Sequence, residues 1–313
     1  KSYIPRPLYT KRIEPFIDKE VIKVITGQRR TGKSYILLQI SDMIKKERPE
    51  ANIIFVDKEQ LAFAAIKNYM DLYQYVLKMT AGHSYNYLFV DEIQEIEDFQ
   101  LCLRSLLNEN KCDIYCTGSN AKMLSGELAT HLAGRYIEFP VHSLSYEEFL
   151  TFNRRQDSSE SLRLYLTFGG MPYIHNLAME TNVIFEYLRN VYSTILLKDV
   201  VAREAIRNVS FLENLVAYLI DNTGSLFSAQ NICKYLKSQQ VNIPTQTILN
   251  YLRALCNSFF VYKIQRAETQ GMKIFEIGEK YYFEDLGLHN AIRHFDFRKD
   301  INKLMENVVV LIC

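Results

Sequence analysis

The segment Gly27 to Ser34 holds the residues whose types and spacing point most directly to chemistry. It reads Gly-Gln-Arg-Arg-Thr-Gly-Lys-Ser and fits G-x-x-x-x-G-K-[ST] at each fixed position. Loops of this pattern turn their backbone amides toward phosphates, and their lysine reaches the β and γ phosphates. The residues before it favour a strand and those after it favour a helix, so a chance glycine turn is the weaker interpretation.

We expect this loop and the residue after it to bind a nucleoside triphosphate together with magnesium. Lys33 supplies the point charge on the phosphates, and the Ser34 hydroxyl is the expected magnesium ligand. Arg29 and Arg30 add positive potential, although we expect Arg29 to be solvated. The predicted nucleotide-binding residues are Gly27, Gln28, Arg29, Arg30, Thr31, Gly32, Lys33, Ser34 and Tyr35.

Two consecutive carboxylates, Asp91 and Glu92, follow the apolar run Tyr87-Leu-Phe-Val. A phosphate-binding loop needs a carboxylate at the end of a neighbouring strand to hold magnesium through its waters, and Asp91 fits that role. Glu92 is placed to polarise an attacking water as a general base. Alone this pattern is a common strand end, but its position two strand-helix units after the loop favours a role in the same site.

The next apolar run ends at Thr117-Gly-Ser-Asn, where Ser119 and Asn120 are candidates to contact the γ phosphate or the attacking water. Either residue could instead cap the helix that follows, and one residue can do both. We keep Asn120 as a predicted catalytic residue.

Short β-branched runs alternate with helical patterns through the first half of the chain. This alternation predicts a doubly wound α/β domain in which a parallel sheet is covered on both faces. The predicted strands are 20–26, 52–57, 85–91, 112–117 and 135–141, and the predicted helices are 33–48, 59–80, 98–110 and 120–132.

The second half is predicted to be mostly helical, with helices at 161–167, 182–206, 211–222, 228–239 and 244–257. Two strands, 259–266 and 273–283, then flank a turn at Gln270-Gly271. Three helices followed by a two-stranded wing is the order of a winged helix. The expected domains are 1–155 for the P-loop ATPase, 156–209 for a helical linker, 210–290 for the winged helix and 291–313 for a further segment.

Together these motifs resemble prokaryotic ATPases of the AAA+ superfamily, of the type called AAA-fourteen, over essentially the whole chain. Three motifs of the second half resemble the C-terminal domain of unknown function that accompanies this ATPase: Phe168 to Tyr173, Leu197 to Val201 and Lys280 to Leu288. The resemblance implies a P-loop NTPase sheet of AAA+ type, a preference for ATP, and presumed ATP hydrolysis.

The resemblance also assigns a role to Arg135, because AAA+ proteins place an arginine here that reaches a neighbouring subunit's nucleotide. Arg135 could act in trans on the transition state, or contact the nucleotide of its own chain. A surface salt bridge is the alternative. A homo-oligomer and a monomer are both compatible with the sequence.

The predicted winged helix raises the question of DNA binding. Thr245, Gln246, Asn250 and Arg253 would be exposed on its second helix and are able to read base edges. However, residues 210–285 contain as many acidic as basic residues, whereas nucleic-acid modules normally carry a positive excess. Packing on the ATPase core or on a protein partner is therefore favoured over DNA.

The bulk composition sets wider limits. The net charge is +1, no apolar run is long enough to span a bilayer, and the amino end does not read as a signal peptide, so we expect a cytoplasmic protein. The six cysteines are expected to be reduced, with Cys112 and Cys116 in the core rather than on a metal. The chain stops inside the apolar run 308–313, from which we expect a longer parent protein.

Three functions are compatible with these features. The first is a magnesium-dependent ATPase whose nucleotide state is coupled to the winged-helix domain. The second is a nucleotide switch that hydrolyses poorly until a partner supplies Arg135 or another group. The third is a DNA-binding module whose assembly is controlled by the loop. No Asn-Lys-x-Asp guanine motif occurs, which weakens a GTPase interpretation.

Overall fold

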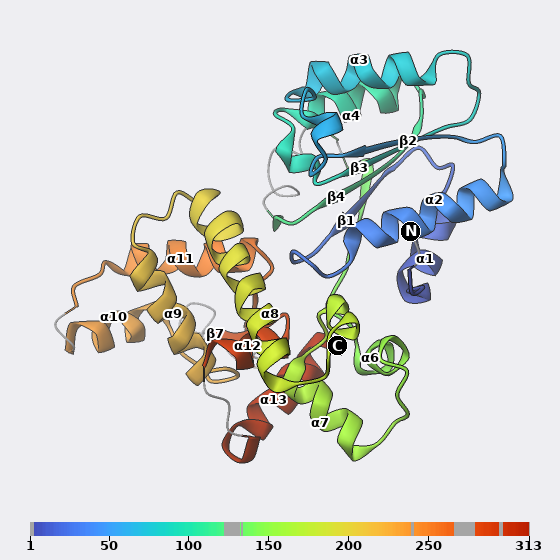
Figure 1. Ribbon diagram of the computed structural model, residues 1–313. Coiled ribbons are helices and arrows are strands. Elements are labelled where there is room, and N and C mark those ends of the chain that lie inside the picture. The colour runs from blue at the N-terminus through green and yellow to red at the C-terminus, as the bar shows by residue number, and fades with distance from the viewer. Residues whose placement is uncertain are drawn as a thin grey trace, which may run out of the picture. The chain divides into compact units, whose positions relative to one another are not determined.

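The computed structural model describes residues 3–121, 132, 134–238, 241–265, 279–293 and 297–312. The chain divides into two compact units, Lys1–Val141 and His142–Cys313 (Figure 1). This division falls before the domain boundary at residue 155 that the sequence suggests. The reason is that helix α6 (Tyr146–Phe152) packs against helix α7 (Ser159–Phe168), so that both belong to the second unit.

The first unit contains a five-stranded parallel sheet in the order β2-β3-β4-β1-β5. All five predicted strands are confirmed. Because every strand runs in the same direction, the segments after β1, β3 and β4 all begin at the same side of the sheet, where the strands have their carboxyl ends. The order places β4 between β1, which leads into the loop, and β3, which ends at Asp91. The strands are β1 Ile22–Thr26, β2 Asn52–Asp57, β3 Asn86–Asp91, β4 Asp113–Gly118 and β5 Tyr136–Pro140.

Helices cover both faces of this sheet (Figure 1). On one face α3 and α4 pack on a core that includes Val24, Ile54 and Leu103, and on the other α1 and α2 pack on a core that includes Ile25 and Phe89. The helices are α1 Pro7–Ile13, η1 Glu14–Phe16, α2 Lys33–Glu47, η2 Leu61–Phe63, α3 Tyr69–Thr80, η3 Ile93–Glu95 and α4 Phe99–Asn108.

The expectation of one helix over 59–80 is wrong, because only its second part is an α-helix. Asn68 ends the preceding segment in extended conformation, and its side chain accepts hydrogen bonds from the amides of Met70 and Asp71. The Asp71 carboxylate in turn accepts the amide of Asn68, which completes a capping box. Most of the helix expected over 120–132 lies outside the described residues.

The second unit is mostly helical, as the sequence predicts. After α8 the chain continues into a π-helix, η6, and later three helices precede the antiparallel pair β6 and β7. The predicted turn at Gln270-Gly271 lies outside the described residues. The elements are η5 Pro172–Asn176, α8 Thr181–Thr194, η6 Ile195–Ala202, α9 Val209–Asp221, α10 Ala229–Ser238, α11 Thr245–Asn257, β6 Val261–Gln265, β7 Glu279–Phe283, α12 Leu286–Ile292 and α13 Phe297–Ile312.

Two smaller expectations concern cysteines and membranes. Cys112 and Cys116 are buried free thiols in the core of the first unit, as predicted. In the part of the chain that the structure describes, no helix is long and apolar enough to cross a membrane.

Candidate active site

The loop after β1 depends on two glycines for its path. Gly27 has φ +145°, and a Cβ added to it would lie 2.1 Å from the carbonyl oxygen of Val141. Gly32 has φ 96° in the left-handed region and directly precedes α2. A larger residue at either position would meet steric or conformational strain. The loop therefore leads its backbone to the positive end of α2, which favours anions.

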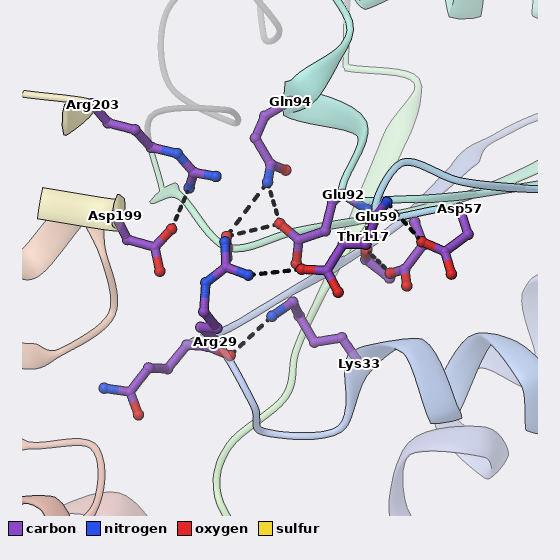
Figure 2. Close-up of polar contacts among 12 residues, drawn as sticks. Arg29, Lys33, Asp57, Glu59, Glu92, Gln94, Thr117, Asp199 and Arg203 are labelled. Carbon is purple, nitrogen blue, oxygen red and sulfur yellow. Dashed lines mark hydrogen bonds and ion pairs between the residues drawn. The ribbon is translucent and has the colours of Figure 1, made fainter. Parts of the chain in front are cut away.

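Lys33 is buried at the start of α2, with 4% of its surface exposed. Its Nζ donates to the carbonyl oxygen of Gln28 at 2.9 Å (Figure 2). The Thr31 hydroxyl donates to the same oxygen at 2.9 Å. One carbonyl thus holds two side chains of the loop, and the lysine ammonium is kept inside the loop's curve.

The amino-terminal segment supports the same loop through Arg6, which the sequence analysis missed. Arg6 is 2% exposed, and its Nη1 donates to the carbonyl oxygen of Thr31 at 2.8 Å. Its guanidinium lies over the ring of Tyr9 at 4.5 Å. No local pattern singles out an arginine 21 positions before the loop, so only the fold reveals this contact.

The predicted magnesium residues come together at the end of β3. Asp91 is 4% exposed, and its carboxylate accepts hydrogen bonds from the side chains of Ser34 and Thr117, the latter at 2.5 Å. Burial raises the pKa of Asp91, and these two hydrogen bonds offset part of the increase. Magnesium keeps most of its waters in proteins, so a hydroxyl beside one carboxylate fits it.

Glu92 is held in a left-handed backbone conformation, with φ 54° and ψ 52°. Its amide donates to the hydroxyl oxygen of Thr117 at 2.9 Å, so that one threonine holds both consecutive acids. Burial tends to raise the pKa of Glu92, but the nearby charges of Lys33 and Arg29 outweigh it and the pKa is lowered. The carboxylate is therefore ionised at neutral pH.

Two side chains converge on the Glu92 carboxylate (Figure 2). The Ser119 hydroxyl donates to Glu92 Oε2 at 3.0 Å, and Gln94 Nε2 donates to the same oxygen. Of the two candidates after β4, Ser119 thus contacts the site's acid, while Asn120 is buried directly beyond it and its catalytic role stays a prediction. Thr117 was not predicted because it meets Asp91 and Glu92 only in the sheet, and Gln94 was not predicted because no local pattern shows that its side chain turns back to Glu92.

The expectation that Arg29 is solvated is wrong. Arg29 is 6% exposed, and its Nη1 forms an ion pair with Glu59 Oε1 at 2.9 Å. The partner follows β2, thirty residues along the chain, so the pairing leaves no local signal. Arg30 is the exposed arginine of the loop, and Tyr35 on α2 is 45% exposed.

Arg135 lies where the parallel strands begin, whereas the loop lies where they end. It precedes β5, its carbonyl accepts the amide of Ile22 at 3.0 Å, and its Nη2 donates to Asn108 Oδ1 at 2.7 Å. The loop follows the other end of β1, about 16 Å away at roughly 3.3 Å per strand residue. An arginine side chain is much shorter than this separation, so Arg135 does not reach a nucleotide bound at the loop of its own chain. Its role at a neighbouring subunit's site stays a prediction.

Buried polar atoms without a partner gather in this region. Among the described residues, four buried side-chain atoms have no hydrogen-bond partner, and three of them belong to Gln28 and Gln94. Gln28 lies in the loop with none of its surface exposed, and both ends of its amide are unpaired. Since buried polar groups are normally paired, these atoms fit a polar ligand or ordered water.

Two family models match the chain. An AAA domain covers residues 19–150, and a domain of unknown function, DUF8612, covers residues 159–299. The chain is similar in fold to a Walker-type ATPase, PABY2304 of Pyrococcus abyssi, with a TM-score of 0.62 and 14% identity over 93% of this chain and 96% of that one.

Curated relatives extend the similarity along the chain. An uncharacterized protein of Haemophilus influenzae is 33% identical over 99% of this chain and 78% of its own length. The uncharacterized protein MJ1544 of Methanocaldococcus jannaschii is 30% identical over 93% of this chain and 66% of its own length. The chain belongs to the family that joins an AAA-type ATPase domain to this domain of unknown function.

Proposed function

We propose that the chain binds ATP with magnesium and hydrolyses it at the site of Lys33, Ser34, Asp91 and Glu92. The observation that carries this proposal is the junction of the loop with the two acids. Ser34 bonds to the Asp91 carboxylate, and the Thr117 hydroxyl bonds to both Asp91 and the Glu92 amide. The family supports ATP as the nucleotide, because its first domain is of the AAA type.

Each residue has a distinct task in the proposed reaction. Ser34 and Asp91 would hold magnesium, which shields phosphate charge when bound. Lys33 exchanges its contact with Gln28 for one with the terminal phosphate. Glu92 accepts a proton from water while the water oxygen bonds to the γ phosphorus. The bond from that phosphorus to the bridging oxygen breaks, and its electron pair leaves with ADP.

Phosphate release and ATP binding, measured separately on three variants, test the proposal. Lys33→Ala should lose both, whereas Glu92→Gln should keep binding and lose about 100-fold or more in turnover, since general-base groups contribute that much. Glu50→Gln, an exposed carboxylate on the same unit, is the matched control and should match wild type. Glu92→Gln turnover equal to wild type would contradict the assignment.

A nucleotide switch with slow intrinsic turnover is the second candidate, and the lowered pKa of Glu92 favours it. A carboxylate stabilised in its charged form is a weaker base. Arg135 is exposed and could complete a neighbour's site. Mixing Arg135→Ala chains, whose loop is intact, with Lys33→Ala chains should restore turnover if the arginine acts in trans. Activity that never rises above that of the separate variants would exclude this route.

Coupling between nucleotide and the second unit has a covalent route in residues 141–144. Val141 lies against the loop, because its carbonyl fills the space where Gly27 would carry a Cβ and its amide bonds to Thr26. Two residues later, the Ser143 amide donates to the Glu284 carboxylate at 2.6 Å, and the Ser143 hydroxyl donates to the Glu284 backbone carbonyl at 2.9 Å. A shift of the loop on binding ATP would therefore pull directly on a segment anchored within the second unit. Glu284→Ala, which removes the side-chain acceptor of the Ser143 amide, should leave ATP affinity intact while removing the nucleotide dependence of protease protection in residues 142–313.

Exposed polar side chains on α11 keep DNA binding as a further candidate. Gln246, Asn250 and Arg253 are exposed at helical spacing, as expected, whereas Thr245, which was also expected to be exposed, is half-buried. Against it, Lys263 on β6 is paired with Glu279, and Lys280 on β7 with Glu306. Pairing removes the positive excess that phosphate binding needs. Binding to duplex DNA in a salt titration should be lost in Arg253→Ala; no binding at low ionic strength would end this candidate.

A further inference from the structure

Gln94 uses the two ends of its side-chain amide in different ways. Its Nε2 donates to Glu92 Oε2 and lies 3.4 Å from the Ser119 hydroxyl. Its Oε1 is buried and has no hydrogen-bond partner among the residues that the structure describes. Gln94 thus carries an unpaired, buried acceptor two residues after the proposed general base (Figure 2).

The kind of partner that this acceptor can take is limited by its chemistry. A neutral carbonyl oxygen accepts hydrogen bonds and repels phosphate oxygens, so it suits a group that brings its own hydrogen. A water molecule brings two. When two acceptors each take one hydrogen of the water, its lone pair is held in one direction. A single carboxylate leaves the water free to rotate.

We propose that Gln94 orients the attacking water, with Oε1 accepting one hydrogen while the Glu92 carboxylate accepts the other. The hydrogen bond from Gln94 Nε2 fixes the Glu92 carboxylate relative to the Gln94 amide, so that Gln94 Oε1 and the carboxylate keep a constant position relative to each other. Gln94 gains and loses no proton; the proton goes to Glu92 as the water oxygen bonds to phosphorus. The inference rests on the proposed ATP hydrolysis and deepens it.

Gln94→Met provides the first test, because methionine keeps the length of the side chain and loses both hydrogen-bonding groups. Turnover should fall about 10- to 100-fold, as expected for a misplaced reactant, while KM changes less than about threefold. Gln156→Met, an exposed glutamine of the same chain, is the matched control and should match wild type.

Binding gives a readout that does not depend on turnover. ADP with aluminium fluoride mimics the transition state, in which the transferring phosphoryl group lies in line with the attacking water, whereas a non-hydrolysable ATP analogue mimics the ground state. Gln94→Met should weaken the aluminium fluoride complex about 10-fold and leave the analogue's affinity unchanged. Loss of both affinities together would overturn the proposal, since it would show a role in holding nucleotide.

Gln94→Glu separates orientation of water from a purely structural role. A protonated glutamate can donate to Glu92 and accept from water, as the amide does, while an ionised one repels Glu92. The pair of carboxylates will share a proton at low pH. The turnover of this variant relative to wild type should therefore rise as pH falls, and Gln94→Met should show no such recovery.

The outcomes separate this inference from the function on which it rests. Wild-type phosphate release with an equally active Gln94→Met refutes the role of Gln94 alone. A wild-type chain that binds ATP and releases no phosphate refutes hydrolysis, and the role of Gln94 with it. A flat ratio of Gln94→Glu to wild-type turnover across pH also overturns the orientation of water.

Discussion

Replacing Thr117 with valine should destabilise the first unit and weaken binding of magnesium at the proposed site. Valine has nearly the shape of threonine and lacks the hydroxyl, which donates to Asp91 Oδ1 at 2.5 Å and accepts from the Glu92 amide at 2.9 Å. Thr117 is completely buried, so water cannot readily replace either bond. The substitution therefore removes two contacts without creating a large cavity.

The size of the effect follows from the two bonds. Hydrogen bonds to charged groups contribute about 1.5–3 kcal/mol, and a buried amide left unpaired costs about 1–3 kcal/mol. Allowing for local relaxation, we expect a loss of about 3 kcal/mol in the free energy of unfolding. At about 2.1 cal/mol/K of unfolding entropy per residue, a unit of this length would melt roughly 10 °C lower.

Calorimetry of the full chain at neutral pH measures this shift, with two controls. Thr117→Ser keeps the hydroxyl and should recover most of the loss. Thr167→Val removes a hydroxyl that bonds to the carbonyl of Arg163 within its own helix, and should change the melting temperature little. A first-unit transition in Thr117→Val within about 2 °C of wild type would refute the reasoning, since it corresponds to well under 1 kcal/mol.

The same substitution has a pH-dependent consequence. The Thr117 hydrogen bond lowers the pKa of Asp91, which burial raises, so its loss should raise that pKa further. A protonated carboxyl binds cations poorly, and a higher pKa enlarges the protonated fraction as pH falls. The magnesium concentration that gives half-maximal ATP turnover should thus be higher for Thr117→Val than for wild type at pH 6, and the difference should be smaller at pH 8. An equal difference at both pH values would contradict this.

Three further tests are independent of Thr117. Gln28→Met removes a buried amide without partners and should raise the stability of the nucleotide-free chain by about 1–3 kcal/mol, while reducing the thermal shift produced by ATP. Burial raises the pKa of Asp285 to about 6, so wild-type stability should fall by about 2 kcal/mol from pH 4 to pH 6.5, and Asp285→Asn should flatten this slope in urea titrations. Gly170→Ala places a Cβ 2.2 Å from a backbone oxygen and should unfold the second unit, whereas Gly82→Ala meets no atom within 4 Å and should cost about 1 kcal/mol.

The sequence predicted the sheet well because its strands are short, continuously apolar and separated by helical patterns. β2 matches its predicted range, and β3 begins one residue later than expected. The predicted helix over 59–80 was less accurate, because apolar spacing continued through residues 61–63 while the Asn68 capping box set the start of α3. Periodicity alone does not show where a helix begins when two apolar segments are in phase.

The residues of the candidate site could be named from the sequence because their motifs are local, whereas the contacts that support them join distant parts of the chain. Lys33, Ser34 and Asp91 lie in patterns that can be read within a few residues. Thr117 meets Asp91 only because β4 pairs with β3, and Arg29 meets Glu59 because β2 ends at the same edge. Such partners are fixed by strand order, which a single sequence does not contain.

The motifs of the second unit are explained by packing rather than by chemistry. Asp285 accepts the amides of Gly170 at 2.7 Å and Leu288 at 2.9 Å, which joins the motif 168–173 to the motif 280–288. Gly287 packs against the carbonyl of Phe168 so closely that an added Cβ would lie 1.9 Å from its oxygen. Helices α7 and α12 can pack together only if these positions hold glycine or a buried acid. Such residues identify the fold and carry no information about a substrate. The second unit's function is therefore better sought on the exposed face of α11 and in the segment 141–144 than in the motifs that identify its family.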